Sequence, residues 1–130
     1  MKGHKDWVHS VAWAPNGRRV ASASSDHAVR LWCADTGDCE QVFAGHTQTV
    51  TSLSFAHNGI FLASGSLDGT VRVWDTNEGV PAACMRPDGD DGAVHCVAFV
   101  LDDERVVAGC GGKSVKVWNF RSGEQDLRFR

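Results

Sequence analysis

The sequence has little of what marks a nucleic-acid-binding, membrane or secreted protein. Lys and Arg number 13 against 16 Asp and Glu, with a net charge of −3 and no basic stripe that would bind nucleic acid or a membrane surface. The longest apolar stretch, Val94–Leu101, is too short to span a bilayer and is interrupted by His95. The first residues, Met1 to His4, lack the apolar segment of a signal peptide. We therefore expect an intracellular protein, cytoplasmic or nuclear, with no nucleic-acid or membrane partner.

The cysteines form no recognisable metal or disulfide pattern. They are odd in number and irregularly spaced, with no Cys-x-x-Cys pair and no His at a spacing that completes a zinc set: Cys33, Cys39, Cys84, Cys96 and Cys110. Only Cys33 and Cys39 are placed to meet across a hairpin, and free thiols in a reducing compartment are the simpler interpretation. We expect no metal and no cofactor.

What the sequence does contain is a repeat with a period of 42 residues. The second copy repeats the first at several positions: Gly3-His4 as Gly45-His46, Val8 as Val50, Val11 as Leu53, Asn16-Gly17 as Asn58-Gly59, Asp26 as Asp68, and Arg30-Leu31-Trp32 as Arg72-Val73-Trp74. A weaker third copy follows at an offset of 44, with Val94, Val97, Phe99, Val115 and Trp118 in the matching places. A repeat of this length is one supersecondary unit that cannot bury its apolar face alone, so the units must stack.

Each copy divides into four short segments with the alternation of a β-strand, separated by turn residues. In the first copy the expected strands are Val8 to Trp13, Arg19 to Ser24, Val29 to Cys33 and Glu40 to Phe43. The second copy carries the strong hairpin signals Asn58-Gly59 and Asp68-Gly69. No window has helical periodicity. The chain is predicted to be all-β, with twelve strands in three antiparallel four-stranded units at residues 3–44, 45–86 and 87–130.

These residues resemble the WD-repeat (WD40) β-propeller family. The resemblance rests on the Gly-His dipeptide, the strand that follows it, the Ala-Ser-x-Ser-x-Asp segment and the ending Trp74-Asp75, and it extends from Gly3 to about Phe129. It implies blades of four strands and about 40–45 residues each. Departures from the pattern are Cys33 in place of the final Asp in the first copy, and Gly89-Asp90 and Trp118-Asn119 in the third. The fold class expected is a partial propeller of three blades, forming an open arc.

The resemblance also implies a buried hydrogen-bonded network in each blade. Its members are His4, Ser22, Asp26 and Trp32 in the first copy, and His46, Ser64, Asp68 and Trp74 in the second. Ser24 and Ser66 lie on the same strand faces as Ser22 and Ser64, so the choice of serine stays open. The third copy keeps only Trp118, because Asp90, Ala108 and Gly112 occupy the other positions.

Histidine, serine and aspartate are also the residue types of a nucleophilic triad. A hydrolase using His4 or His46 is therefore one hypothesis for the function. The set recurs with the period of the fold, whereas an active site is singular, so we expect a structural role and no enzyme.

Partner-binding residues are expected on loops beside the central channel, which the resemblance implies is the recognition face. The loops concerned are Lys5-Asp6-Trp7, Thr47-Gln48-Thr49 and Asp90-Asp91-Gly92-Ala93, with Ser25, Leu67 and Gly111 in the turns beside them. Trp7 is the strongest candidate because large amphipathic aromatics are enriched at binding hot spots. Its alternative role is to pack against the next blade or to cap its own strand. Arg30, Arg72 and Lys116 share one repeated strand position, which suggests a solvated face or charges at a sheet edge.

Three units are fewer than the roughly 4–8 blades of closed propellers. The end blades would expose apolar faces, to be covered by further blades of the same parent protein or by self-association into a ring, for instance of six blades. The leading functional hypothesis is a non-catalytic scaffold that binds proteins or peptides, as a fragment or subunit of a larger propeller or complex. The alternative is a sensor or oligomerisation segment of a longer NTPase-linked signalling protein.

Overall fold

The computed structural model describes residues 2–86, 92–111 and 114–129, and these residues form three separate antiparallel sheets. Blade 1 has the strand order β1-β2-β3-β4, with bounds β1 Val8–Trp13, β2 Arg19–Ser24, β3 Val29–Cys33 and β4 Cys39–Phe43. Blade 2 contains β5 Val50–Phe55, β6 Phe61–Ser66, β7 Val71–Asp75 and β8 Val80–Met85. Blade 3 contains β9 Val94–Phe99, β10 Arg105–Cys110, β11 Ser114–Asn119 and β12 Glu124–Phe129.

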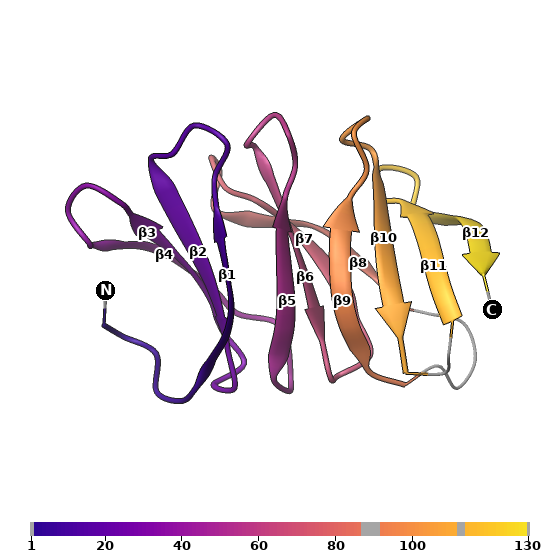
Figure 1. Ribbon diagram of the computed structural model, residues 1–130, viewed down its shortest axis with the longest axis horizontal. Helices are drawn as coiled ribbons and strands as arrows, with labels where there is room; N and C mark the ends of the chain where they lie inside the picture. The colour runs from indigo at the N-terminus through magenta and orange to yellow at the C-terminus, as the bar shows by residue number, and fades with distance from the viewer. Residues whose placement is uncertain (1, 87–91, 112–113, 130) are drawn as a thin grey trace.

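The three sheets stand side by side, with the N-terminus at one end of the row and the C-terminus at the other (Figure 1). The predicted all-β class and the four-stranded antiparallel units are confirmed. The repeat is also exact in register, since Trp32, Trp74 and Trp118 each lie opposite an aliphatic residue of the second strand. No helix in the described part of the chain is long and apolar enough to cross a bilayer.

The apolar core lies between the sheets. Between blades 1 and 2 it contains Ala21, Ala23, Val29, Leu31, Phe43, Val50, Leu53, Leu62 and Trp74. Between blades 2 and 3 it contains Ala63, Val71, Val73, Met85, Val94, Val97, Phe99, Val106 and Trp118, with Ala56, Ala108 and Phe120. Each blade therefore has a leading face, which in blade 2 is Val50, Leu53, Leu62 and Trp74 and packs on the preceding blade. Its trailing face, which in blade 2 is Ala63, Val71, Val73 and Met85, packs on the following blade.

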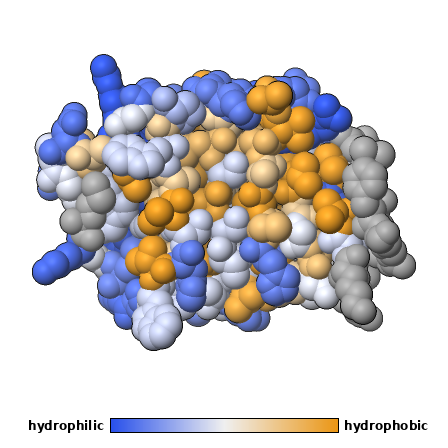
Figure 2. Space-filling model, viewed as in Figure 1, coloured by the Kyte–Doolittle hydropathy of each residue, from blue (hydrophilic) through white to orange (hydrophobic). Residues whose placement is uncertain are grey.

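The leading face of blade 1 has no blade in front of it. Val11 and Trp13 are 66% and 65% exposed, whereas Leu53, the repeat equivalent of Val11, is 8% exposed. The difference comes from the missing neighbour, because the residues are equally apolar. Figure 2 shows the wider pattern: apolar side chains form a band across the middle of the molecule, with hydrophilic side chains along its upper edge.

Side-chain hydroxyls join the inner strands of blades 2 and 3. The amide N–H of Val97 donates to the Ser52 hydroxyl and that of Phe99 to the Ser54 hydroxyl, each at 3.1 Å. The inner strands β5 and β9 belong to different sheets, so these bonds give β9 partners along an edge that no strand pairs. They fix how blade 3 sits against blade 2.

The hairpin turn of blade 3 departs from the repeat. Gly17 and Gly59 hold the left-handed conformation in the first two blades, both with φ 73°, and Asp103 takes it in the third with φ 57°. Its carboxylate reaches back to blade 2, where it accepts the amide N–H groups of His57 at 2.6 Å and Asn58 at 2.9 Å. The exposed turn that carries Asp103 therefore also links blade 3 to the backbone of blade 2.

The prediction of a solvated face at Arg30, Arg72 and Lys116 is wrong. Lys116 is fully buried, and both arginines are partly buried. For the two arginines the cause is the Gly-His turn, which folds over this strand position: a Cβ at Gly45 would lie 2.9 Å from Nη1 of Arg72 and 3.2 Å from Cη2 of Trp74. The glycine of the dipeptide is required because the backbone approaches these side chains so closely.

Candidate functional site

A chain of hydrogen bonds runs through blade 2 from the indole of Trp74 to the carboxylate of Asp68. The indole N–H donates to the hydroxyl of Ser64 at 2.9 Å, and that hydroxyl lies 2.7 Å from Nε2 of His46. Nδ1 of His46 lies 3.0 Å from Oδ2 of Asp68. Thr70 completes the set by donating its hydroxyl to Asp68 at 2.6 Å. All four residues predicted for this network are brought together, and Thr70 is a fifth member that sequence reasoning missed.

When the ring of His46 is neutral, the hydrogen bonds of this network can all be donated in one direction, from Trp74 toward Asp68. The hydroxyl of Ser64 accepts from the indole and donates to Nε2, so Nδ1–H is left to donate to Asp68. Burial lowers the pKa of His46, and the neighbouring Asp68 offsets this only in part. Burial alone would raise the pKa of Asp68, but hydrogen bonds from Thr70, from the backbone of Thr47 and from His46 outweigh it and lower the pKa to about 2. The network thus holds a neutral imidazole beside an ionised carboxylate.

Blade 1 contains the same chain of bonds. Trp32 donates its indole N–H to the hydroxyl of Ser22 at 2.8 Å, and His4 lies 2.5 Å from that hydroxyl and 2.8 Å from Asp26. The pKa of Asp26 is lowered to about 2, because hydrogen bonds from the backbone of Lys5 and Ala28 and from His4 outweigh the effect of burial. Ala28 stands where blade 2 has Thr70, so this network lacks the second hydroxyl.

The structure answers which serine of each strand belongs to the network. Ser22 and Ser64 contact the His and Trp side chains. Ser24 and Ser66 instead accept the amide N–H of Asp26 and Asp68, each at 3.1 Å, and so shape the turn that carries the aspartate. The alternation of the strand could not separate these roles, because the two serines of each strand are two positions apart and so lie on the same face.

The order aspartate, histidine, serine reproduces the contacts of a catalytic triad, but the serine is not available to a substrate. Ser64 is 0% exposed and its oxygen already accepts the indole N–H of Trp74. Ser22 is 5% exposed and accepts from Trp32 in the same way. A nucleophile needs a free face toward the reacting carbon. These contacts therefore serve to satisfy buried polar groups.

Blade 3 contains the network tryptophan, Trp118, but its sequence lacks the histidine, serine and aspartate of the other two blades. Ala108 lies on β10 at the register position of Ser22 and Ser64, and within the described residues no hydroxyl reaches the indole of Trp118. Ser114, at the position of Thr70, is buried, and its hydroxyl has no hydrogen-bond partner among the residues that the structure describes. Asp90 and Gly112, predicted at the other network positions, lie outside the described residues. A lost buried hydrogen bond costs about 1 kcal/mol or more.

Blade 3 should therefore open more readily than blade 2. Hydrogen exchange followed by mass spectrometry should show faster amide exchange over Val94–Asn119 than over Val50–Asp75, because local opening reports local stability. The two segments have the same strand number and topology, so each serves as the reference for the other. Slower exchange in blade 3 would contradict the expectation.

The loops predicted to form the recognition face come together in pairs. The amide N–H of Ser25 donates to the carbonyl of Trp7 at 2.8 Å, and that of Leu67 to the carbonyl of Thr49 at 3.0 Å. In blade 3, Gly111 donates to the carbonyl of Ala93 at 2.8 Å. The same bond recurs in every blade, so the face is built on fixed backbone. Asp90 and Asp91 of the predicted third loop lie outside the described residues.

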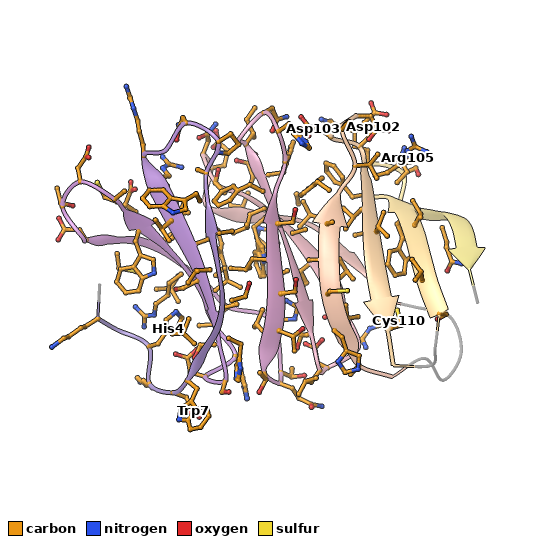
Figure 3. All side chains as sticks on the ribbon, viewed as in Figure 1. His4, Trp7, Asp102, Asp103, Arg105 and Cys110 are labelled. Atoms are coloured by element: carbon orange, nitrogen blue, oxygen red, sulfur yellow. The ribbon has the colours of Figure 1, made fainter. Side chains whose placement is uncertain are left out.

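Trp7 is the most prominent side chain of this face. It is 78% exposed and lies at the edge of the molecule opposite the turn that carries Asp103 (Figure 3). The alternative that it packs against the next blade is not what the structure shows. Asp6 accepts the backbone N–H of Trp7 at 2.8 Å and holds the loop. Lys5 and Asp6 are exposed beside it, and Ser25 is partly buried.

The corresponding loop of blade 2 is smaller. Gln48 is exposed, Thr49 is partly buried and Leu67 is 38% exposed.

One contact on this face was missed in the sequence analysis: Nε2 of His9 lies 2.5 Å from the hydroxyl of Ser25. The sequence gives little indication of this contact, because blade 2 has Thr51 at the repeat position of His9, so the histidine does not recur. In the described part of the chain no cysteine forms a disulfide, and no group of three His, Cys, Asp or Glu suited to a metal occurs there.

Comparison with known proteins finds relatives that match one repeat at a time. The chain is 59% identical over 39 residues to the transcriptional corepressor LEUNIG_HOMOLOG of Arabidopsis thaliana, covering 30% of this chain and 5% of that protein. It is 49% identical over 45 residues to a probable E3 ubiquitin ligase complex SCF subunit sconB of Arthroderma benhamiae, covering 35% and 7%. It is 50% identical over 38 residues to the protein transport protein sec13 of Emericella nidulans, covering 27% and 12%.

Solved structures match the whole arrangement. The structure of U3-55K superposes with a TM-score of 0.91 at 22% identity, covering 98% of this chain and 40% of that one. The RRP9 WD40 repeats give a TM-score of 0.90, also at 22% identity, covering 98% and 39%. At this identity the likeness shows the fold alone, and the chain spans well under half the length of either structure.

The family assignment rests on all three repeats. The profile of the family described as WD domain, G-beta repeat matches residues 1–33, 37–75 and 83–119. Each match contains the first three strands of one blade, and the second and third matches also take in β4 and the end of β8 from the preceding blade. The predicted family is confirmed: this chain belongs to the WD40 repeat family.

Proposed function

We propose that the chain is a non-catalytic interaction scaffold that binds proteins or peptides on the loop face of blades 1 and 2. Trp7 is the observation that carries the proposal. An indole that is 78% exposed, on a loop tied to its turn by a backbone hydrogen bond, loses little conformational entropy when a partner covers it.

The chemistry around Trp7 fits a mixed polar and apolar partner. Lys5 and Asp6 flank the indole with opposite charges, and both are exposed. On the neighbouring blade, Gln48 supplies an amide that can donate and accept, and Leu67 a partly exposed aliphatic side chain. An aromatic anchor with a polar rim is the usual anatomy of a protein interface.

The relatives support a role in assemblies. Their names describe a transcriptional corepressor, a subunit of a ubiquitin ligase complex and a protein transport protein. By analogy we place this chain inside the cell, as part of a larger propeller or complex, and without catalytic activity. Nucleic acid and membrane are not among the partners we propose, because the net charge is −3 and no basic stripe is present.

Affinity purification with the parent chain and with Trp7→Ala tests this proposal. We expect the variant to lose most of the proteins that the parent retains, because truncating a hot-spot aromatic costs about 2 kcal/mol or more of binding free energy. Retained proteins are quantified by mass spectrometry.

The matched control is Leu101→Ala, which removes an 80% exposed apolar side chain from the hairpin between β9 and β10. That hairpin carries Asp102 and Asp103, which lie at the edge of the molecule opposite Trp7 (Figure 3). It should leave the retained proteins unchanged. Equal retention by the parent and by Trp7→Ala would contradict a partner site at this face.

A further inference from the structure

His27 is one of two residues other than glycine that hold the left-handed backbone conformation in the described part of the chain. Its φ is 75°, and that of Asp103 is 57°. This conformation is unfavourable for a residue that carries a Cβ. Asp103 compensates for it within the chain, because its carboxylate accepts the amide N–H groups of His57 and Asn58. His27 therefore needs a compensating contact of its own.

Glycine would form the same turn at the position of His27. The equivalent residue in blade 2 is Gly69, which follows the network aspartate in the same way and has φ 86°. The two turns are closed alike: the N–H of His27 donates to the carbonyl of Ser24 at 3.3 Å, and that of Gly69 to the carbonyl of Ser66 at 3.2 Å. The imidazole is therefore not required to build the turn.

The imidazole of His27 has no partner within the described residues. His27 is exposed, and in that part of the chain its ring takes part in no hydrogen bond, ion pair or ring contact. The ring of His9, in contrast, lies 2.5 Å from the hydroxyl of Ser25. A residue that keeps an unfavourable backbone conformation without a contact inside the fold indicates a function outside it.

The repeat places His27 between the loops of two blades. In blade 2 a Cβ added at Gly69 would lie 3.2 Å from the carbonyl oxygen of Gly92, in the loop that precedes β9 of blade 3. The residue of blade 2 that corresponds to Gly92, at the offset of 44, is Gln48. The turn of His27 is also hydrogen-bonded to the carbonyl of Trp7. His27 therefore lies between the Trp7 loop and the Gln48 loop, within the loop face.

The loop face of blades 1 and 2 carries three carboxylates, and two of them are occupied within their own blade. The side chain of Asp26 is 10% exposed and accepts three hydrogen bonds from blade 1. That of Asp68 is 5% exposed and accepts hydrogen bonds from blade 2. Asp6 is exposed, and one of its oxygens accepts the backbone N–H of Trp7. Within the described residues of this face, Asp6 alone presents its carboxylate to a partner.

Hydrogen-bond donors outnumber that carboxylate. Lys5 and Gln48 are exposed beside His27, with three N–H donors on the ammonium and two on the carboxamide. The imidazole of His27 has one N–H donor even when it is neutral. None of these three side chains donates a hydrogen bond to another described residue. Carboxylate oxygens accept from such groups through charge-assisted hydrogen bonds, so the face is complementary to an acidic partner.

We propose that the partner of the loop face is an acidic peptide segment. An Asp or Glu side chain of the peptide accepts a hydrogen bond from His27, and a neighbouring apolar side chain packs on Trp7. This inference rests on the function proposed above and names the chemistry of its partner. It gives the reason for a histidine where glycine would form the turn: the contact that compensates for its backbone conformation is made in the complex.

Selection of a phage-displayed library of random dodecapeptides on the purified chain tests the partner class. We expect the selected peptides to contain Asp or Glu within a few positions of an apolar residue. The affinity of one selected peptide is then measured by fluorescence polarisation for the parent and for His27→Gly. Glycine keeps the turn, as Gly69 does, so the variant should be at least as stable in urea and should bind about tenfold more weakly.

A double-mutant cycle tests the pairing of His27 with the acid. Exchanging the acidic residue of the peptide for its amide should weaken binding to the parent about tenfold and should hardly change binding to His27→Gly, because both changes remove one interaction. Asp103→Gly is the matched control. It removes a side chain from the other left-handed residue, at the edge opposite Trp7 (Figure 3), so it should lower the stability and leave the affinity unchanged.

The outcomes separate this inference from the proposed function. Selected peptides without acidic residues, or equal affinity of the parent and His27→Gly for the peptide, would overturn the inference and leave the partner face in place. Equal affinity of the parent and Trp7→Ala for the peptide would overturn the partner face itself. A selection that yields no binding peptide for the parent would overturn both.

Discussion

Replacing Trp74 with alanine should lower the free energy of unfolding by about 3–5 kcal/mol. The side chain is 1% exposed and links three parts of the structure. It stacks on Phe43 of blade 1, contributes to the core between blades 1 and 2, and donates its indole N–H to Ser64. Alanine would leave a cavity between two blades and remove the donor from a buried hydroxyl, and the two costs add.

Urea denaturation followed by circular dichroism measures this effect, and Trp7→Ala is the matched control. The chemical change is the same, but Trp7 is 78% exposed, so its loss should change the stability by no more than about 0.5 kcal/mol. If the two variants had equal stability, Trp74 would not be the junction between the blades that the contacts indicate.

Replacing Asp68 with asparagine should destabilise the chain by about 2 kcal/mol at neutral pH, and this loss should vanish in acid. The folded state lowers the pKa of this carboxyl from its ordinary 3.8 to about 2, so the unfolded chain takes up the proton first as the pH falls. The stabilisation is therefore complete above about pH 4 and is lost as the pH approaches 2. Asparagine has no such titration, so parent and variant should converge there.

The pH dependence has a second, milder component from His46. Its folded pKa lies below its ordinary 6.5 because the ring is buried, so acidification favours the unfolded chain from about that pH downward. Urea denaturation at a series of pH values separates the two ranges. Asp38→Asn, the same change at an exposed position between β3 and β4, is the control and should leave the free energy of unfolding at neutral pH unchanged within about 0.5 kcal/mol. A constant difference between parent and Asp68→Asn down to pH 2 would contradict the assignment of an ionised carboxylate to the network.

Much of the fold was predictable because each copy of the repeat contains the strands and turns of one blade. The Asn-Gly and Asp-Gly pairs fix hairpins locally, and the alternation of β-branched and polar residues gives the strands, so twelve strands in three sheets follow from neighbours in sequence. The network residues His46, Ser64, Asp68 and Trp74 were expected as a set because the resemblance to the WD-repeat family implies them. Thr70 was not, because blade 1 has Ala28 at that position and the comparison of copies hid it.

Contacts between distant parts of the chain could not be predicted in this way. Arg72 looks like a solvent-facing charge on a strand, and only the Gly-His turn of the same blade, folded over that strand, shows that it is partly covered. Asp103 reads as a turn residue, but its carboxylate holds the backbone of the preceding blade. Such contacts join residues about 45 positions apart, and local propensity carries no information about them.

The sequence by itself determined the four strands and the turns of each unit, because these depend on spacing within about 40 residues. Its resemblance to the WD-repeat family also implied which polar side chains pair inside each blade. Only the tertiary structure decided which faces are covered. Val11 and Leu53 are equivalent in sequence, and one is 66% exposed while the other is 8% exposed. The physical reason is that burial is a property of the neighbour, and the first blade has none in front of it.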